Sequence, residues 1–257
     1  MTELDNAHAA MEAAPDNDAL RLQFYERLVD TELFMLLGAE AAEDRIAPEI
    51  FEIEDRRFAL VFDREERLSQ FVGCVAPYAG LPGRALAQML VGQGIGLALN
   101  LEVAPSAMLI PDEAVDWLAK TLSNGPQETE ARLRELIAPN VPESVVSGLD
   151  RKLATAAGMA RSAYLAGAIY EDNTRGHVLA FLDAQDGAEQ ALASAANEAL
   201  TFSGIEAGMI DVLFVRASDP LAAYLAKVGL RFDLPEPVQP MTPTAPGMDS
   251  EKPPRLK

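Results

Sequence analysis

Hydrophobic and polar positions alternate most regularly between residues 94 and 118, and this stretch organises the rest of the chain. Ile95, Leu97 and Leu99 are separated by Gly96 and Ala98, so one face of an extended segment carries large side chains and the other carries small ones. Such a segment can be covered closely on both faces. We therefore expect a sheet strand that is packed on both sides.

A polar break follows this strand, because Glu102 and Pro105 interrupt the apolar run and proline lacks the amide hydrogen that a central strand donates. A second short strand is predicted at residues 108–110, and Pro111 suits the first turn of a helix. Apolar residues then recur at helical spacing, so Trp117 is expected to face a core. The stretch thus predicts a strand-strand-helix packing unit.

The remaining pattern predicts the rest of a first domain, residues 1–122. Asp63 is expected to cap a helix with Glu66 in a capping box, as Thr2 and Asp5 do at the chain start. Elsewhere the periodicity is that of helices, of one strand and of one hairpin with a polar tip. In chain order we predict a helix to residue 13, a helix over 20–28, a strand over 33–37, a hairpin over 50–62, a loop over 77–83 and a helix over 86–90.

A polar segment, residues 123–130, reads as an interdomain linker because it combines Gly-Pro with polar side chains. A second domain, 131–233, then shows the same succession of periodic patterns. Beyond it, seven prolines fall in residues 234–257, which predicts a disordered tail. In the second domain we predict a short helix over 131–137, a helix over 145–156, strands over 162–170 and 177–183, a helix over 188–202, a strand over 209–215, a helix from Asp219 and an edge strand over 231–234.

These elements predict an α+β fold with two domains, each a small mixed sheet covered by helices. The chain carries 40 acidic and 21 basic residues, a net charge of -19, which disfavours nucleic acid and anionic membrane as partners. Cys74 is the single cysteine, so no intrachain disulfide forms, and we expect it to be a small buried hydrophobe. The N-terminus has no secretory signal pattern and no apolar run approaches the length of a membrane span, so we expect a soluble, cytoplasmic protein.

Few residues in the sequence are candidates for binding a metal, a cofactor or an anion. His8 and His177 are the two histidines, and neither has a second ligand at metal-binding spacing, so no metal or cofactor is predicted. The glycines of GQGIG follow a helix and precede a strand, which is the reverse of a phosphate loop. GLPGR precedes a helix, so Arg84 could hold an anion there, although a turn and a helix start explain the same residues.

The run from Gly94 to Leu118 resembles the N-terminal domain of the SseB family, named for an enhanced-serine-sensitivity phenotype. Leu20–Leu37 resembles another part of that domain, and Ala163–Leu165 resembles the family's C-terminal domain. The residues that carry the first resemblance are Asn100, Pro105, Leu109 and Pro111. Members often have Asn-Pro-Gly at the strand end, where this chain has Asn100, Leu101 and Glu102. The resemblance implies a fold, and no agreed molecular activity comes with it.

We therefore expect a non-catalytic module that binds a protein or a small ligand. The predicted contact surface is the loop from Asn100 to Pro105 with the start of the next helix, and the candidate binding residues are Asn100, Glu102 and Arg84. The alternative, prompted by the family name, is an enzyme for a small amino-acid-like metabolite, with Arg84 binding its carboxylate and His177 as base. A third hypothesis is a scaffold whose proline-rich tail recruits partners.

Overall fold

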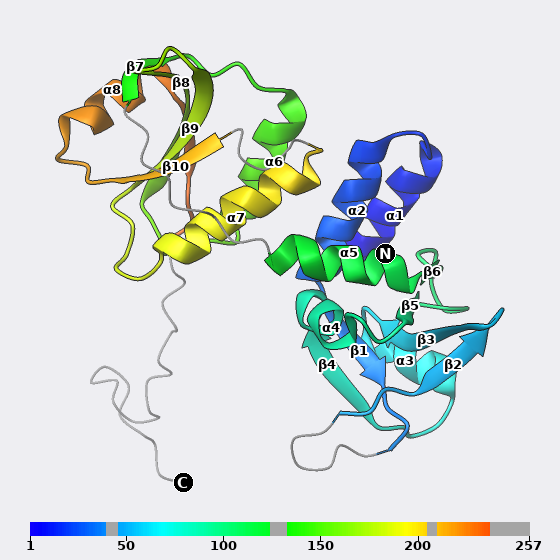
Figure 1. The fold of residues 1–257 in the computed structure, drawn as a ribbon. Coiled ribbons are helices and arrows are strands. Elements are labelled where there is room, and N and C mark those ends of the chain that lie inside the picture. Colours follow the sequence, from blue (N-terminus) through cyan, green and yellow to red (C-terminus); the bar gives the residue numbers. More distant parts are fainter. Residues whose placement is uncertain (40–45, 124–132, 205–209, 237–257) are drawn as a thin grey trace, which may run out of the picture.

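The structure is a computed structural model that describes residues 1–39, 46–123, 133–204 and 210–236. Two mixed sheets, each accompanied by helices, are formed by the two halves of the chain (Figure 1). The predicted α+β fold is confirmed. Most of the predicted linker and residues 237–257 of the predicted tail lie outside the described residues, so the domain boundaries stay a prediction.

The N-terminal half forms a sheet of order β4-β1-β3-β5-β6, with β2 also paired to β3. β3 and β5 are parallel, and the other pairs are antiparallel. The hairpin tip between β2 and β3 is formed by Glu54 and Asp55, both with positive φ. The elements are α1 (Glu3–Ala13), α2 (Asp18–Asp30), β1 (Glu32–Leu36), β2 (Ile50–Ile53), β3 (Arg56–Phe62), α3 (Glu65–Val72), β4 (Tyr78–Pro82), α4 (Gly83–Leu90), β5 (Ile95–Leu99), β6 (Met108–Ile110) and α5 (Asp112–Ser123).

Both faces of this sheet are apolar, as the pattern of β5 predicts. On one face, Leu97 and Leu99 pack with buried side chains of α1, α2, α4 and α5. On the other face, Ala98 packs with β1, β3 and the shorter α3. Burial of one large apolar side chain contributes about 1.5–3 kcal/mol, so the thicker helical layer supplies most of the stabilisation here.

The C-terminal half forms a sheet of order β10-β9-β8-β11, with β7 also paired to β8. β9 and β10 are parallel, and β11 pairs with β8 alone, as expected of an edge strand. α6 and α7 cover one face of this sheet, and α8 packs on the other. The elements are β7 (Leu133–Ile137), α6 (Glu143–Leu153), β8 (Ser162–Tyr170), β9 (Arg175–Leu182), α7 (Glu189–Phe202), β10 (Ile210–Val215), α8 (Pro220–Val228) and β11 (Leu230–Asp233).

Three local predictions are wrong. The helix expected within residues 131–137 is strand β7, which pairs with the C-terminal end of β8. The loop expected at 77–83 contains strand β4, an edge strand in which Pro82 is tolerated. Asp63 does not cap α3, whose N-cap is Arg64 without a side-chain hydrogen bond, because the Asp63 carboxylate is bound elsewhere.

Two predicted core residues are also exposed. Cys74 is exposed because α3 ends at Gly73, whose positive φ of 70° turns the chain away from the helix. Trp117 is 37% exposed and packs against Tyr25 and Phe202, with ring centroids 5.8 and 6.1 Å away. Since Phe202 belongs to α7, this tryptophan lies where the two halves of the chain meet.

Candidate functional site

The loop after β5 is fixed by a buried side chain at its start. Asn100 is fully buried and has a positive φ of 49°, which asparagine tolerates better than most residues. Its side-chain oxygen accepts a hydrogen bond from the backbone N–H of Asp63 (3.1 Å), and its amide donates to Ser106 Oγ (2.9 Å). Ser106 donates in turn to Asp5 Oδ1 (2.6 Å). The two ends of loop 100–106 are therefore tied to α1 and to the end of β3.

Two further groups complete this buried network. Arg67 donates to both Asp5 oxygens (3.0 and 2.6 Å) and to Asp63 Oδ1 (2.6 Å). The Thr2 hydroxyl donates to Asp63 Oδ2 (2.6 Å). Burial alone would raise the pKa of Asp5, but hydrogen bonds from Arg67, Ser106 and the Thr2 backbone outweigh it and hold that pKa well below its usual range. Asp5 stays ionised, and the network serves to fix geometry.

The outer part of the loop is presented to solvent by this anchor. Glu102 is exposed and has a positive φ of 61°. Leu101 and Val103 on either side are half-buried and pack on the apolar cluster that α3 covers. Asn100 therefore positions the loop from within, whereas Glu102 lies at the exposed surface of the loop.

Arg84, the third predicted binding residue, lies in a different place and is already bound. Its guanidinium donates to Asp30 of α2 and to both oxygens of Glu198 of α7 (3.3 Å each). Burial would lower the pKa of Arg84, but the two carboxylates raise it above its usual value. Lys152 Nζ of α6 joins the same two acids, at 2.7 Å from each. Arg84 thus belongs to an ion-pair cluster that connects the two halves of the chain.

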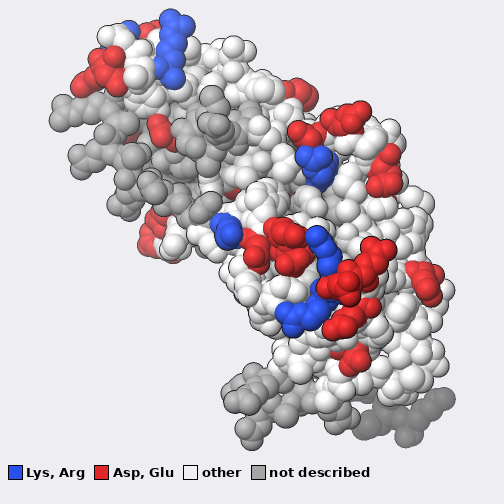
Figure 2. Space-filling model, turned by 45° about the vertical axis from the view of Figure 1, so that its right-hand side comes forward, with Lys and Arg blue, Asp and Glu red and all other residues white. Residues whose placement is uncertain are grey.

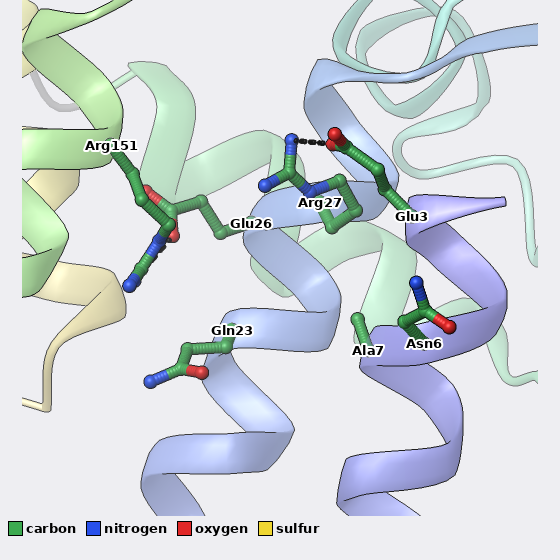
Figure 3. Close-up of a pocket in the computed structure, with 7 residues that line it drawn as sticks. All are labelled: Glu3, Asn6, Ala7, Gln23, Glu26, Arg27 and Arg151. Carbon is green, nitrogen blue, oxygen red and sulfur yellow. Dashed lines mark hydrogen bonds and ion pairs between the residues drawn. The ribbon is translucent and has the colours of Figure 1, made fainter.

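A hollow of about 260 Å³ lies beside this cluster, between α1, α2 and α6 (Figure 3). Its opposite charges are paired, Glu3 with Arg27 (2.7 Å) and Glu26 with Arg151 (3.3 Å). Glu26 is buried, and its Oε1 has no hydrogen-bond partner among the described residues. Burial raises the pKa of Glu26 despite the nearby Arg151 and Lys152. The full lining is Glu3, Asn6, Ala7, Gln23, Glu26, Arg27 and Arg151.

The residues considered for catalysis are not brought together. His177 of β9 accepts a hydrogen bond from the backbone of Asn140 (3.4 Å), while Arg84 is held by acids of α2 and α7. Cys74 lies exposed between α3 and β4. Within the described ranges, no group of three or more His, Cys, Asp or Glu side chains is placed to hold a metal ion.

Sequence reasoning found Asn100 but missed the long-range hydrogen bonds of its network, which include the bond from the backbone N–H of Asp63 and the bond to Ser106. Thr2 and Asp5 were recognised as a capping pair, yet their bonds to Asp63 and Ser106 span 61 and 101 positions. The buried position of Glu198 could have been predicted from the sequence, because it is a charged residue within a helix whose other inward residues are apolar. A buried carboxylate requires a cation, which the structure supplies.

Acidic side chains outnumber basic ones on the side of the molecule shown in Figure 2, in line with the net charge of -19. Across the described part of the chain, no helix is long and apolar enough to span a membrane.

Comparison with known proteins identifies the N-terminal half. Residues 4–117 match the family model described as the SseB protein N-terminal domain. These residues begin within α1, whose Asp5 is bound to the loop, and run into α5. No curated protein and no solved structure matches the chain.

Proposed function

Because residues 4–117 are an SseB N-terminal domain, the chain belongs to the SseB family through that domain, and we propose that it is a non-catalytic binding module. Its contact surface is the loop from Leu101 to Pro105, with the start of α5. A protein partner fits this surface best, because the loop presents half-buried apolar side chains around an exposed carboxylate.

The observation that carries this proposal is the buried anchor of the loop. Asn100 and Ser106 hold the loop at both ends through hydrogen bonds to Asp63 and Asp5. A surface that is already ordered before binding loses little conformational freedom on association, so more of the contact energy appears as affinity. The network is therefore well suited to prepare a recognition loop.

The non-catalytic part of the proposal follows from the way the candidate groups are used. Arg84 is committed to Asp30 and Glu198, and His177 bonds to a backbone amide on another element. We place the protein in the cytoplasm, as its unpaired cysteine and acidic surface favour.

Capture of partners from a lysate tests the loop. Glu102→Lys reverses its exposed charge while leaving Asn100 and the network intact, and Glu171→Lys, at the exposed turn of the C-terminal hairpin, is the matched control. Quantitative mass spectrometry should show the captured partner reduced about tenfold by the first variant and unchanged by the control. Equal capture by the parent chain and both variants would discard the loop as the contact surface.

A further inference from the structure

One edge of the sheet in the C-terminal half is a strand with an unpaired outer side. β10 ends the strand order and pairs with β9 alone, so its outward backbone groups have no strand partner among the described residues. α8, which follows β10 in the chain, lies mainly over β8 and β7. A row of free N–H and C=O groups is a template on which another strand can pair.

The other outer strands of the two sheets carry features that hinder such pairing. β2, β6 and β11 are three or four residues long. β4 contains Pro82, and β7 has a register shift between Leu133 and Glu135. Natural edge strands are protected by short length, proline or a bulge in this way. β10 has six residues, IDVLFV, without proline, glycine or a register shift, so its edge is left available.

The side chains of β10 are mostly apolar and incompletely covered. Phe214 is 40% exposed, and its ring stacks on Phe181 of β9 with 5.8 Å between the centroids. Leu213, on the other face, is half-buried. The single charged residue, Asp211, already accepts a hydrogen bond from the Tyr170 hydroxyl. An apolar six-residue edge of low charge is the kind of segment that pairs with a copy of itself.

The order of residues in β10 is complementary to a second copy in the antiparallel direction. A two-fold axis through Val212, perpendicular to the sheet, places Ile210 of each copy opposite Phe214 of the other. Asp211 of each copy then lies opposite Leu213 of the other. Residues opposite each other share a face of the sheet, as antiparallel pairing requires. Each exposed phenylalanine is covered by an isoleucine, and no two carboxylates face each other.

We propose that two copies of the chain pair through β10, antiparallel about Val212, and so join their C-terminal sheets into one. The net charge of -19 opposes association at long range, but salt screens that repulsion beyond about 8 Å at physiological ionic strength. At the edge itself each copy brings one carboxylate, that of Asp211, which Tyr170 binds. The inference is independent of the proposed binding function, because the loop from Leu101 to Pro105 belongs to the other half of the chain.

Analytical ultracentrifugation of the full chain tests the pairing. We expect a species of twice the 27.6 kDa chain mass, whose share grows as salt screens the repulsion between copies. Phe214→Lys should raise the dissociation constant at least about tenfold, because both copies lose a cross-strand apolar contact. Tyr224→Lys, at a 58% exposed position on α8, is the control and should leave it unchanged. A parent chain that stays monomeric at every concentration and salt would overturn the proposal, as would a dimer that Phe214→Lys leaves intact.

The register is tested by two charges at one position. Leu213→Glu places a carboxylate opposite Asp211 of the other copy, and Leu213→Lys places an ammonium there, so the fold is perturbed alike. The two-fold axis doubles each interaction, and the Lys variant should dimerise about tenfold more tightly than the Glu variant. Tyr224→Glu and Tyr224→Lys differ by the same net charge and should dimerise alike, with circular dichroism confirming the fold of all four variants. Equal dimerisation of the two Leu213 variants would overturn the pairing about Val212.

Discussion

Asn100 shows how one side chain can serve both backbone geometry and a polar network. A left-handed conformation costs an L-residue roughly 1–2 kcal/mol, and asparagine reduces that cost by hydrogen bonding locally. Here the amide is buried, with its oxygen and its nitrogen each bonded. The same position therefore stores backbone strain and satisfies two buried groups.

Removal of this amide should be costly. Asn100→Ala leaves the backbone N–H of Asp63 and the hydroxyl of Ser106 without one partner each, in a site with no exposure. We expect the free energy of unfolding to fall by about 3 kcal/mol, measured by urea denaturation. Asn6→Ala, on the exposed side of α1, should change it by less than about 0.5 kcal/mol. Similar values for the two variants would show that the network contributes little stability.

At this scale, sequence predicted what is local and missed what is distant. The capping pair Thr2 and Asp5 is confirmed, because its two residues are three positions apart on one helix turn. Asp63 was predicted from the same rule to cap α3, yet Arg67 and Thr2 bind its carboxylate. Local rules assign a polar side chain to its nearest backbone amide, and tertiary contacts can offer it a better partner.

Gly83 allows two helices, α2 and α4, to come into close contact. It is the first residue of α4, and a Cβ atom there would lie 2.1 Å from the carbonyl oxygen of Leu28 and 3.0 Å from Val29 Cα. The end of α2 therefore touches the start of α4 backbone to backbone. This contact brings Asp30 of α2 within reach of Arg84, one residue into α4.

Gly83→Ala should be destabilising even though alanine is the better helix former by about 1 kcal/mol. The added methyl group meets rigid backbone, so we expect the free energy of unfolding to fall by about 3 kcal/mol in thermal or urea denaturation. Gly187→Ala is the matched comparison, because its φ of 85° strains an alanine while nothing lies within 4 Å. That variant should lose only about 1–2 kcal/mol. A smaller loss for Gly83→Ala than for Gly187→Ala would contradict the close approach.

The elements that sequence predicted well are those whose partners are neighbours in the chain. Both hairpins, over 50–62 and 162–182, pair strands across short turns. β4 and β7 were missed because each pairs with a strand far along the chain, β1 and β8, and each carries residues atypical of strands, such as Pro82 and Glu135. Edge strands need less apolar sequence, so their pattern is the weakest.

The two halves of the molecule are joined by charges as well as by aromatic rings. Lys152 is 5% exposed and binds Asp30 of the N-terminal half and Glu198 of its own half. Asp30 and its partner Lys152 are 122 positions apart in sequence, and Arg84 and its partner Glu198 are 114 positions apart. With 40 acidic residues in the chain, no sequence pattern could single out these pairs.

Lys152→Met tests whether this cluster stabilises the joined molecule. Removal of a buried cation leaves Asp30 and Glu198 with only Arg84 between them, so we expect the free energy of unfolding to fall by about 3 kcal/mol in urea denaturation. Lys120→Met, at an exposed position of α5, should change it by less than about 0.5 kcal/mol. If the two variants behave alike, the cluster adds no more than a surface lysine does.

Glu26 should give the junction a pH dependence of its own. Burial raises its pKa above the usual 4.5, although Arg151 and Lys152 oppose that change and Asp30 adds to it. The folded chain therefore holds a proton there more tightly than the unfolded chain. Protonation of Glu26 stabilises the folded chain fully below pH 4.5, and this stabilisation is lost as pH rises through the raised pKa. At neutral pH the ionised, half-satisfied carboxylate therefore lowers the free energy of unfolding.

Glu26→Gln removes that charge and should raise the free energy of unfolding at pH 7 by about 1 kcal/mol, with no gain at pH 4. Urea denaturation of the variant and the parent chain at both pH values measures the difference. The lowered pKa of Asp5 affects stability in the opposite sense, but its contribution cancels in the comparison because both chains contain Asp5. Glu3→Gln makes the same change at a side chain 76% exposed, where no pH-dependent gain is expected. A loss of stability in Glu26→Gln at pH 7 would mean that attraction to Arg151 outweighs burial.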